Sequence, residues 1–437
     1  MQRRSVIPLL VGTFIQRLNS GAGTVIYGLL LAQLASHTGH RITSLQVGLL
    51  PVVFYIAELT LAPLMGSLSD HFGRRRFLVL GPLLGLIQVG LLIFTPTRNP
   101  LPYLLILQVL AGISSAITTP VVLSYLADFT ALDADRRMRI MSFYELVTSG
   151  GIAVGTVLGG FAWERFERGS YVLLAVLYFV VAVCMSLSPV INQMVDRGTL
   201  KVIAMRYWSI LRTPRLFIFI PAWICISALV GVWFSSQLTF ILSNPAHNPQ
   251  QLLMGSTSGP GGGHRLSLIL GGYVLYFGLC LLFWAFFLNR VPRLRLMLLS
   301  VSGVFLACVA LAGINHRGEG DDMLLFLWVP LLMIGVFAET SFAPAALAYL
   351  ADISEEAAKD RGLLMGLYSV FLGLGQILGN GMGGIFAHAL GFDGLIYLTA
   401  LLACIALPSL LGLNRYERKA LPVHGHHSHR MSDSVTT

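Results

Sequence analysis

Residues 120–128 read PVVLSYLAD and residues 344–352 read PAALAYLAD, so one stretch of this chain recurs 224 positions further on. Extended without gaps, residues 120–160 are identical to residues 344–384 at 14 of 41 positions. Each copy also carries four glycines at matching places. Internal repeats of this kind arise when one structural unit occurs twice. The sequence therefore predicts two related halves, with the two copies at equivalent places in them.

The composition places most of this chain in a membrane. Of its 437 residues, 55% are hydrophobic and only 11% are charged, which is too little charge to cover the surface of a soluble protein. A spanning helix needs about 20 apolar residues, so we expect an all-α membrane protein with twelve transmembrane helices. The twelve apolar segments run approximately over residues 6–34, 45–66, 77–95, 101–127, 140–162, 170–189, 215–242, 267–289, 296–314, 323–351, 362–388 and 392–413.

The positively charged residues indicate how the chain is oriented. With the amino terminus in the cytoplasm, 22 of the 29 Lys and Arg residues fall in cytoplasmic segments. Positive residues concentrate in cytoplasmic loops, so both termini are predicted to be cytoplasmic and the protein to lie in the inner or plasma membrane. The same scatter argues against nucleic acid as a partner, despite the net charge of +9. The first apolar run contains Gln16, Arg17 and Asn19, so we expect an uncleaved first helix rather than a signal peptide.

The longest basic connection divides the twelve spans six and six. It covers residues 190–214 and is predicted to be a cytoplasmic linker between an amino-terminal half at 1–189 and a carboxy-terminal half at 215–413. A polar cytoplasmic tail follows at 414–437. Two halves of equal orientation imply a pseudo-twofold axis along the membrane normal, with a pathway between them.

Between the second and third spans, residues 66–76 read GSLSDHFGRRR. This loop resembles the signature G-x-L-a-D-r-x-G-R-[kr]-x of the major facilitator superfamily. Taken with the twelve spans, the repeat and the central basic loop, the resemblance covers essentially the whole chain. It implies the fold of that family, with two pseudo-symmetric six-helix halves, and transport by alternating access. The residues that fill the signature are Gly66, Leu68, Asp70, Gly73, Arg74 and Arg75.

The resemblance also implies a cytoplasmic gate. In the family, the signature loop is thought to latch the two halves together by contacting the eleventh span. Carried onto this chain, Asp70 is the latch residue, with Arg74 and Asp128 as its expected partners, and Gly66 and Gly73 allow a tight turn and a close helix approach. The alternative is that the arginines only enforce topology and that the acidic residues cap helix ends. The remaining gate candidates are Arg75 and the residues of the repeated pairs, Asp128 with Arg137 and Asp352 with Arg361.

Charged residues inside the spans mark the candidate substrate site. A charge at the bilayer centre costs about 2.5–3.5 kcal/mol, so it is expected only beside a partner or a polar cavity. Arg17 lies about 20 Å into the first span, at about 1.5 Å per residue, and Glu58 lies comparably deep in the second. We hypothesise that Arg17 binds an anionic group of the substrate or pairs with Glu58 when the site is empty; a static pair that fastens the two spans is the alternative. Thr13, Ser20 and Thr24 continue a polar stripe from Arg17 along the same helix.

Two further acidic residues are candidates for the substrate or proton pathway. Glu339 in the tenth span has no basic neighbour on its own helix and is a candidate protonation site, as is Glu58. Glu145 lies about two turns from the cytoplasmic end of the fifth span, where it belongs either to the pathway or to the gate. Ser114 and Ser115 in the fourth span are candidates for additional hydrogen bonds or for helix packing.

These features predict a secondary transporter that exports an amphipathic organic compound or metabolite, with protons as a candidate coupling ion. Uptake of a small organic anion is the alternative within transport, and a non-transporting receptor or assembly factor is the alternative outside it. An enzyme is not expected, since the spans contain no nucleophile–base constellation and no metal-ligand cluster. No cofactor or metal is predicted. The expected partners are the small-molecule substrate and the lipid bilayer, and we expect a monomer.

Overall fold

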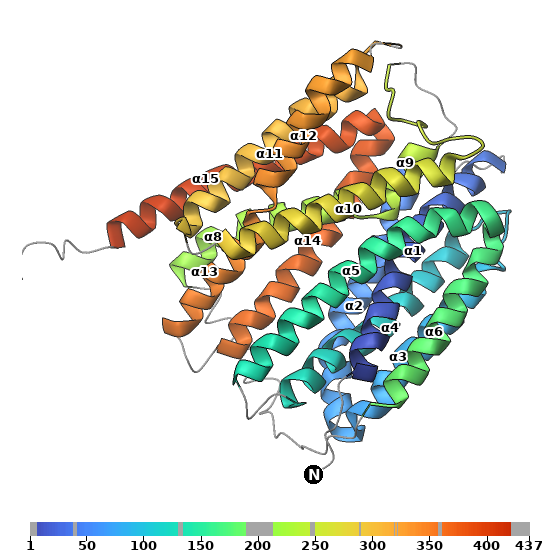
Figure 1. Cartoon of the computed structure of the whole chain (residues 1–437), viewed down its shortest axis with the longest axis horizontal. Coiled ribbons are helices and arrows are strands. Elements are labelled where there is room, and N and C mark those ends of the chain that lie inside the picture. The colour runs from blue at the N-terminus through green and yellow to red at the C-terminus, as the bar shows by residue number, and fades with distance from the viewer. Residues whose placement is uncertain are drawn as a thin grey trace, which may run out of the picture.

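The chain folds into a bundle of long helices that lie side by side (Figure 1). Every regular element in the described part of the chain is a helix, which confirms the predicted fold class. The predicted linker at 190–214 lies almost wholly outside the described residues. The computed structural model describes residues 7–37, 42–129, 134–188, 213–244, 250–287, 290–318, 320, 322–356 and 361–420.

The first six spans follow one another with short connections. Thr43 begins the second helix with a capping box, because its hydroxyl accepts the Gln46 N–H while the Gln46 side chain accepts the Thr43 N–H. The same helix ends at Phe72, where Gly73 takes a positive φ of 94° that a residue with a Cβ rarely adopts. The elements are α1 (Ile7–His37), α2 (Ser44–Phe72), α3 (Arg74–Leu92), α4 (Leu101–Phe129), α5 (Ala134–Phe166), the short η1 (Glu167–Gly169) and α6 (Ser170–Ser186).

The second half contains more elements because two of its spans are broken. Its elements are α8 (Pro214–Trp233), α9 (Ser236–Ser243), α10 (Gly262–Phe287), α11 (Arg293–Asn315), the short η3 (Asp322–Leu324), α12 (Leu325–Glu339), α13 (Phe342–Glu356), α14 (Arg361–Leu390) and α15 (Phe392–Ala420). Eleven stretches of described residues are long and apolar enough to cross a membrane. One of them, Leu146–Ser186, runs through both α5 and α6. Counted separately, these helices give the twelve predicted spans.

Two of the predicted spans, 215–242 and 323–351, are broken helices rather than continuous ones. The first of these spans breaks at Phe234 and Ser235, between α8 and α9, and the second breaks at Thr340 and Ser341, between α12 and α13. Thr340 and Ser341 turn their hydroxyls back to the carbonyls of Phe337 and Ala338, which competes with the helical ladder. A proline at 344 adds to this, because it has no N–H and its ring crowds the carbonyl four residues earlier.

The glycines of the repeat make equivalent contacts in the two halves. Gly155 of α5 packs against the backbone of Leu18 in α1, and its counterpart Gly379 of α14 packs against the backbone of Ala228 in α8. In both places a Cβ would meet a carbonyl oxygen, so only glycine allows the two helices to approach so closely. The repeat therefore encodes the same helix pair twice, α1 with α5 and α8 with α14.

The buried apolar side chains show where the halves are joined. One large cluster combines residues of the first half, such as Ile26 and Leu50, with residues of the second half, such as Phe240. A second cluster contains only first-half residues near the chain termini, among them Leu9 and Tyr125. The halves thus share a core at the end of the bundle away from the termini, whereas near the termini the first half has a core of its own.

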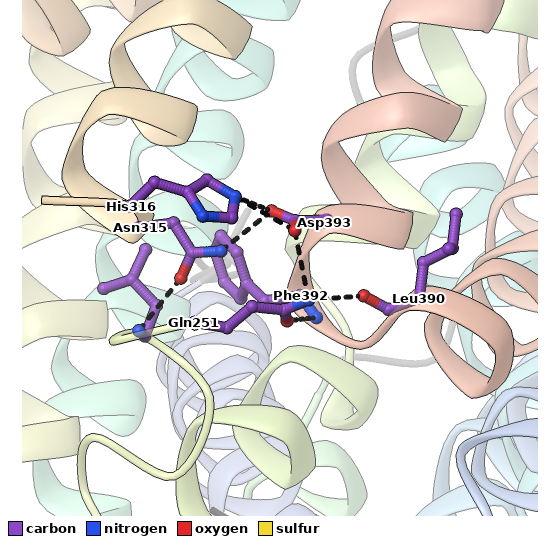
Figure 2. Close-up of polar contacts among 7 residues, drawn as sticks. Gln251, Asn315, His316, Leu390, Phe392 and Asp393 are labelled. Carbon is purple, nitrogen blue, oxygen red and sulfur yellow. Dashed lines mark hydrogen bonds and ion pairs between the residues drawn. The ribbon is translucent and has the colours of Figure 1, made fainter. Parts of the chain in front are cut away.

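A polar cluster centred on Asp393 ties together three segments of the second half (Figure 2). The Asp393 carboxylate accepts hydrogen bonds from Asn315 at 2.8 Å and from Gln251 at 3.0 Å, and it contacts the His316 ring at 2.9 Å. Gln251 also donates to Leu390 O and accepts the Phe392 N–H, each at 2.8 Å. Residues 251–253 are therefore bonded to the ends of α11 and α15.

Candidate transport site

Glycine contacts bring the two halves together at the end of the bundle away from the termini. A Cβ on Gly48 of α2 would lie 2.6 Å from both Asn380 O and the Cα of Gly384 in α14. A Cβ on Gly28 of α1 would lie 2.5 Å from the Cβ of Thr239 in α9. No ordinary side chain fits at Gly28 or Gly48 unless the helices separate. We call the inter-half contacts α1–α9, α2–α9, α2–α14 and α5–α10 the closed end.

Polar groups reinforce the α5–α10 contact of the closed end. The Gly160 N–H donates to the Ser267 hydroxyl at 2.8 Å, and that hydroxyl lies 3.3 Å from Thr156 O. One turn further on, Glu164 accepts the backbone N–H of His264 at 3.1 Å and also contacts the His264 ring. Nothing in the sequence alone pairs Glu164 with His264, because the two residues lie 100 positions apart.

The signature loop is partly described. Gly73 forms the turn into α3, as expected, whereas Gly66 lies inside α2 and a Cβ there would meet no described atom within 4 Å, so the expected close helix approach is not found at Gly66. Arg74 is buried, and Arg75 donates from Nε to Ser186 O at 2.9 Å. That carbonyl belongs to the last residue of α6, where helix carbonyls lack intrahelical partners and favour a cation. The structure does not describe the side chains of Asp70, Asp128, Arg137, Asp352 and Arg361, so the latch stays a prediction.

Glu58 of α2 faces α4 rather than forming the expected pair with Arg17. Its carboxylate accepts a hydrogen bond of 2.6 Å from the Ser115 hydroxyl. Gly112, one turn earlier on α4, permits this approach, because a Cβ there would lie 2.5 Å from Phe54 O. Among the described residues there is no ion pair within 4.0 Å between Arg17 and Glu58, although their charges lie within electrostatic range of each other.

Arg17 is half-buried on the face of α1 that packs against α5, where its Cβ lies opposite Gly151. Tyr55 of α2 lies within electrostatic range of both Arg17 and Glu58, and its hydroxyl meets the side chain of Gln376. Gln376 belongs to α14, so this group of polar side chains reaches across the boundary between the halves. The sequence signal for Gln376 is a single amide in the glycine-rich run GLGQILGNGMGG.

The polar stripe predicted along α1 is only partly free for a ligand. Thr13 is buried and donates to Leu9 O at 2.9 Å, and Thr24 donates to Ser20 O at 3.0 Å. Both threonine hydroxyls therefore bond to their own helix. Ser20 is exposed, and Arg17 remains the one charged group of the stripe.

Glu339 is the last residue of α12, at the break before α13. It is half-buried, and within the part of the chain that the structure describes its carboxylate forms no hydrogen bond or ion pair. Tyr273 of α10 and Cys308 of α11 lie within electrostatic range of it. Glu145 lies in α5, but its side chain is not among those described.

Comparison with known proteins decides the family. The sequence profile described as Major Facilitator Superfamily matches residues 9–263 and 253–430. This chain belongs to the major facilitator superfamily. The family assignment agrees with the signature loop, the twelve spans and the repeat.

Curated members of the superfamily resemble parts of the chain. The Bacillibactin exporter of Bacillus subtilis (strain 168) is 30% identical over 129 residues, which cover 29% of this chain and 32% of the exporter. Multidrug resistance protein 1 of the same strain is 28% identical over 137 residues, 31% of this chain and 34% of that protein. Tetracycline resistance protein, class E, of Escherichia coli is 28% identical over 174 residues, 40% of this chain and 41% of that protein. The alignments thus span less than half the length of each relative.

Solved structures of the superfamily resemble the whole fold. The nucleoside transporter NupG has a TM-score of 0.70 at 14% identity, over 94% of this chain and 98% of that one. The D-xylose-proton symporter has a TM-score of 0.65 at 13% identity, over 93% of this chain and 98% of that one. At such low identity these neighbours bear on the fold alone. As a member of the superfamily, the chain is a multi-pass membrane protein.

Proposed function

We propose that this superfamily member is a secondary active transporter that exports a small amphipathic organic compound or metabolite by alternating access. The observation that carries the proposal is the unequal packing of the two ends of the bundle. The halves share a core and close glycine contacts at the closed end, whereas the first half has a separate core near the termini. A transporter that exposes its site to one side at a time needs such a difference.

The predicted orientation and the relatives support export as the direction of transport. With both termini in the cytoplasm, the closed end faces the outside and the site opens toward the cytoplasm, where an exporter collects its substrate. The relatives named above are an exporter and two resistance proteins. We therefore favour export over uptake. The proposed domain arrangement is an amino-terminal half at 1–189 and a carboxy-terminal half at 215–413, joined by the linker at 190–214.

Protons are the proposed coupling ion, with Glu58 and Glu339 as the candidate carriers. A proton carrier must exchange its proton with water in at least one state and must be able to lose its polar partner. Glu58 has one hydroxyl partner, Ser115, and Glu339 is half-buried. Each of these carboxyl groups is therefore suited to being protonated in one state and ionised in the other.

The decisive experiment is transport into proteoliposomes with an imposed pH gradient. We expect the purified chain to accumulate at least one member of a panel containing tetracycline, a quinolone and bacillibactin, and to do so only with the gradient. Glu58→Gln and Glu339→Gln identify the residue that carries the proton. The neutral variant of that residue should lose substrate accumulation driven by the pH gradient but still exchange substrate across the membrane. Accumulation equal to that of empty liposomes for the whole panel would contradict the proposal.

Uptake of a small organic anion is the second candidate, and Arg17 favours it. In the described part of the chain, the half-buried Arg17 guanidinium forms no hydrogen bond or ion pair, so it is available to an anionic group. Arg17→Gln separates the two candidates. It should abolish anion transport if Arg17 binds the substrate, and it should leave transport of an uncharged or cationic substrate within a fewfold of the parent.

A further inference from the structure

Residues 251–257 join elements of the closed end to elements that take no part in it. They follow α9 and precede α10, and both of these helices contact the first half. The same residues bond to the ends of α11 and α15. In the described part of the chain, α11 and α15 make all their principal helix contacts within the second half. We call residues 251–257 the strap.

The later residues of the strap cap α9. The break at 234–235 separates α9 from α8, so the α8 helix does not continue into α9 and leaves its position to other contacts. The last carbonyls of a helix have no partners within the helix. Here Ile241 O accepts the Gly255 N–H at 3.0 Å. Leu242 O accepts both the N–H and the hydroxyl of Thr257, each at 2.9 Å. The strap therefore holds the free end of α9.

The first residues of the strap are bonded to α11 and α15 (Figure 2). The buried Gln251 side chain donates to the Asp393 carboxylate at 3.0 Å. The Asn315 side chain accepts the Leu253 N–H at 3.0 Å and in turn donates to Asp393 at 2.8 Å. Asp393 thus binds both of the side chains that hold the strap. Hydrogen bonds to an ionised group are about twice as strong as neutral ones, so this carboxylate is the main anchor of the strap.

We propose that Gln251 and Asp393 are positioning residues for the closed end, acting on the contact between the halves through the strap and α9. On another side of α9, Thr239 packs against Gly28 of α1. A bond that is intact only while α9 stays in this position favours the closed state by its own free energy. This inference rests on the proposed alternating access, because it names residues that stabilise one of the two states.

The test measures opening from the first half, to which the strap does not belong. Val47 of α2 is fully buried in the core that the two halves share. Val47→Cys, in a full-length chain without the five native cysteines, should react with a membrane-impermeant maleimide only when the closed end opens. We expect Gln251→Ala and Asp393→Ala each to raise the labelling rate about 5- to 50-fold, because hydrogen bonds that involve a charged group are lost.

Two further variants separate positioning from a general loss of stability. Ser409→Ala is the matched control, because the Ser409 hydroxyl ties the same helix, α15, to Ile218 of α8 and makes no described contact with the strap. It should lower the melting temperature and leave the labelling rate unchanged. Asp393→Asn keeps an oxygen that accepts the Asn315 bond, so it should raise the labelling rate less than Asp393→Ala does. If Asp393→Ala does not give monodisperse protein, Gln251→Ala and Asp393→Asn decide the test.

Two outcomes overturn the role of the strap: labelling rates of the Gln251 and Asp393 variants equal to that of the parent, or an equal rise for Ser409→Ala. Because labelling needs no substrate, the assay does not depend on transport. Faster labelling of the strap variants, together with liposomes that accumulate nothing, would keep the positioning role and reject the exporter. Accumulation of the panel with unchanged labelling would do the reverse.

Discussion

Replacing Gly48 by alanine should open the closed end. The added Cβ would lie 2.6 Å from Asn380 O and from the Cα of Gly384, whereas ordinary van der Waals contact begins at 3.4 Å. Both neighbours are backbone atoms, so no flexible side chain can move aside, and α2 and α14 have to separate by about 0.8 Å. Overpacking of this kind costs about 1–3 kcal/mol. If the open state relieves the clash, its population relative to the closed state rises about 5- to 150-fold.

Labelling of a single cysteine measures that population. Thr239 on α9 is fully buried at the closed end, so Thr239→Cys in a background without the five native cysteines reacts with a membrane-impermeant maleimide only when that end opens. We expect Gly48→Ala to raise the labelling rate about 5- to 150-fold, in proportion to the open population.

Gly272→Ala on α10 is the matched control, because a Cβ there meets nothing within 4 Å. Both substitutions replace a helical glycine by alanine and gain the same intrinsic helix propensity, about 1 kcal/mol. Only the contact across the two halves differs. Equal labelling rates for Gly48→Ala, Gly272→Ala and the parent would refute the assignment of this contact as the closing surface.

Three further substitutions test individual contacts. Glu164→Gln weakens the contact between Glu164 and His264 across the halves and should raise the labelling rate of Thr239→Cys by no more than about fivefold. A rise as large as that caused by Gly48→Ala would show that this contact, rather than helix packing, holds the closed end together. Ser115→Ala should lower thermal stability in detergent by about 1 kcal/mol or more through loss of its hydrogen bond to the acidic residue of α2, whereas Ser302→Ala, at an exposed serine, should not. Gly73→Ala should lower the free energy of unfolding by about 1–3 kcal/mol because residue 73 has a positive φ. Its melting temperature should be lower than that of Gly66→Ala, the control, whose Cβ meets open space. Equal melting temperatures would contradict this.

The sequence predicts the scaffold well because the scaffold is repeated and apolar. Hydropathy locates the twelve spans, and the repeat locates the glycines at which equivalent helices meet. It does not predict the breaks at 234–235 and 340–341. Pro344 and its counterpart Pro120 begin similar sequences, yet α4 runs through Pro120 without interruption. The difference lies four residues earlier, where the second copy has Thr340 and Ser341 and the first has Ala116 and Ile117, residues whose side chains cannot compete for backbone hydrogen bonds.

The candidate site is harder to predict, because the depth of a residue in a span does not determine which neighbouring helix its side chain faces. Arg17 and Glu58 are at similar depths, which suggested a pair. In the structure, Gly112 lets α4 approach α2, and Ser115 takes the Glu58 carboxylate. The contact of Tyr55 with Gln376 depends on how the two halves dock, which no pattern within one half encodes. The roles of the pathway and gate residues therefore remain predictions, whereas the family assignment rests on nearly the whole chain.

The repeat explains why the two halves have the same helix contacts although their charged residues differ. Gly151 of α5 faces Arg17 of α1, and its counterpart Gly375 of α14 faces Ser227 of α8, so the second half has a hydroxyl where the first has a cation. Continuing the 224-residue offset, Glu339 stands where the first half has Ser115. Each of these charged residues thus has a serine at the equivalent position of the other half. The repeat therefore fixes the helix contacts of both halves and leaves the charged positions free to differ between them.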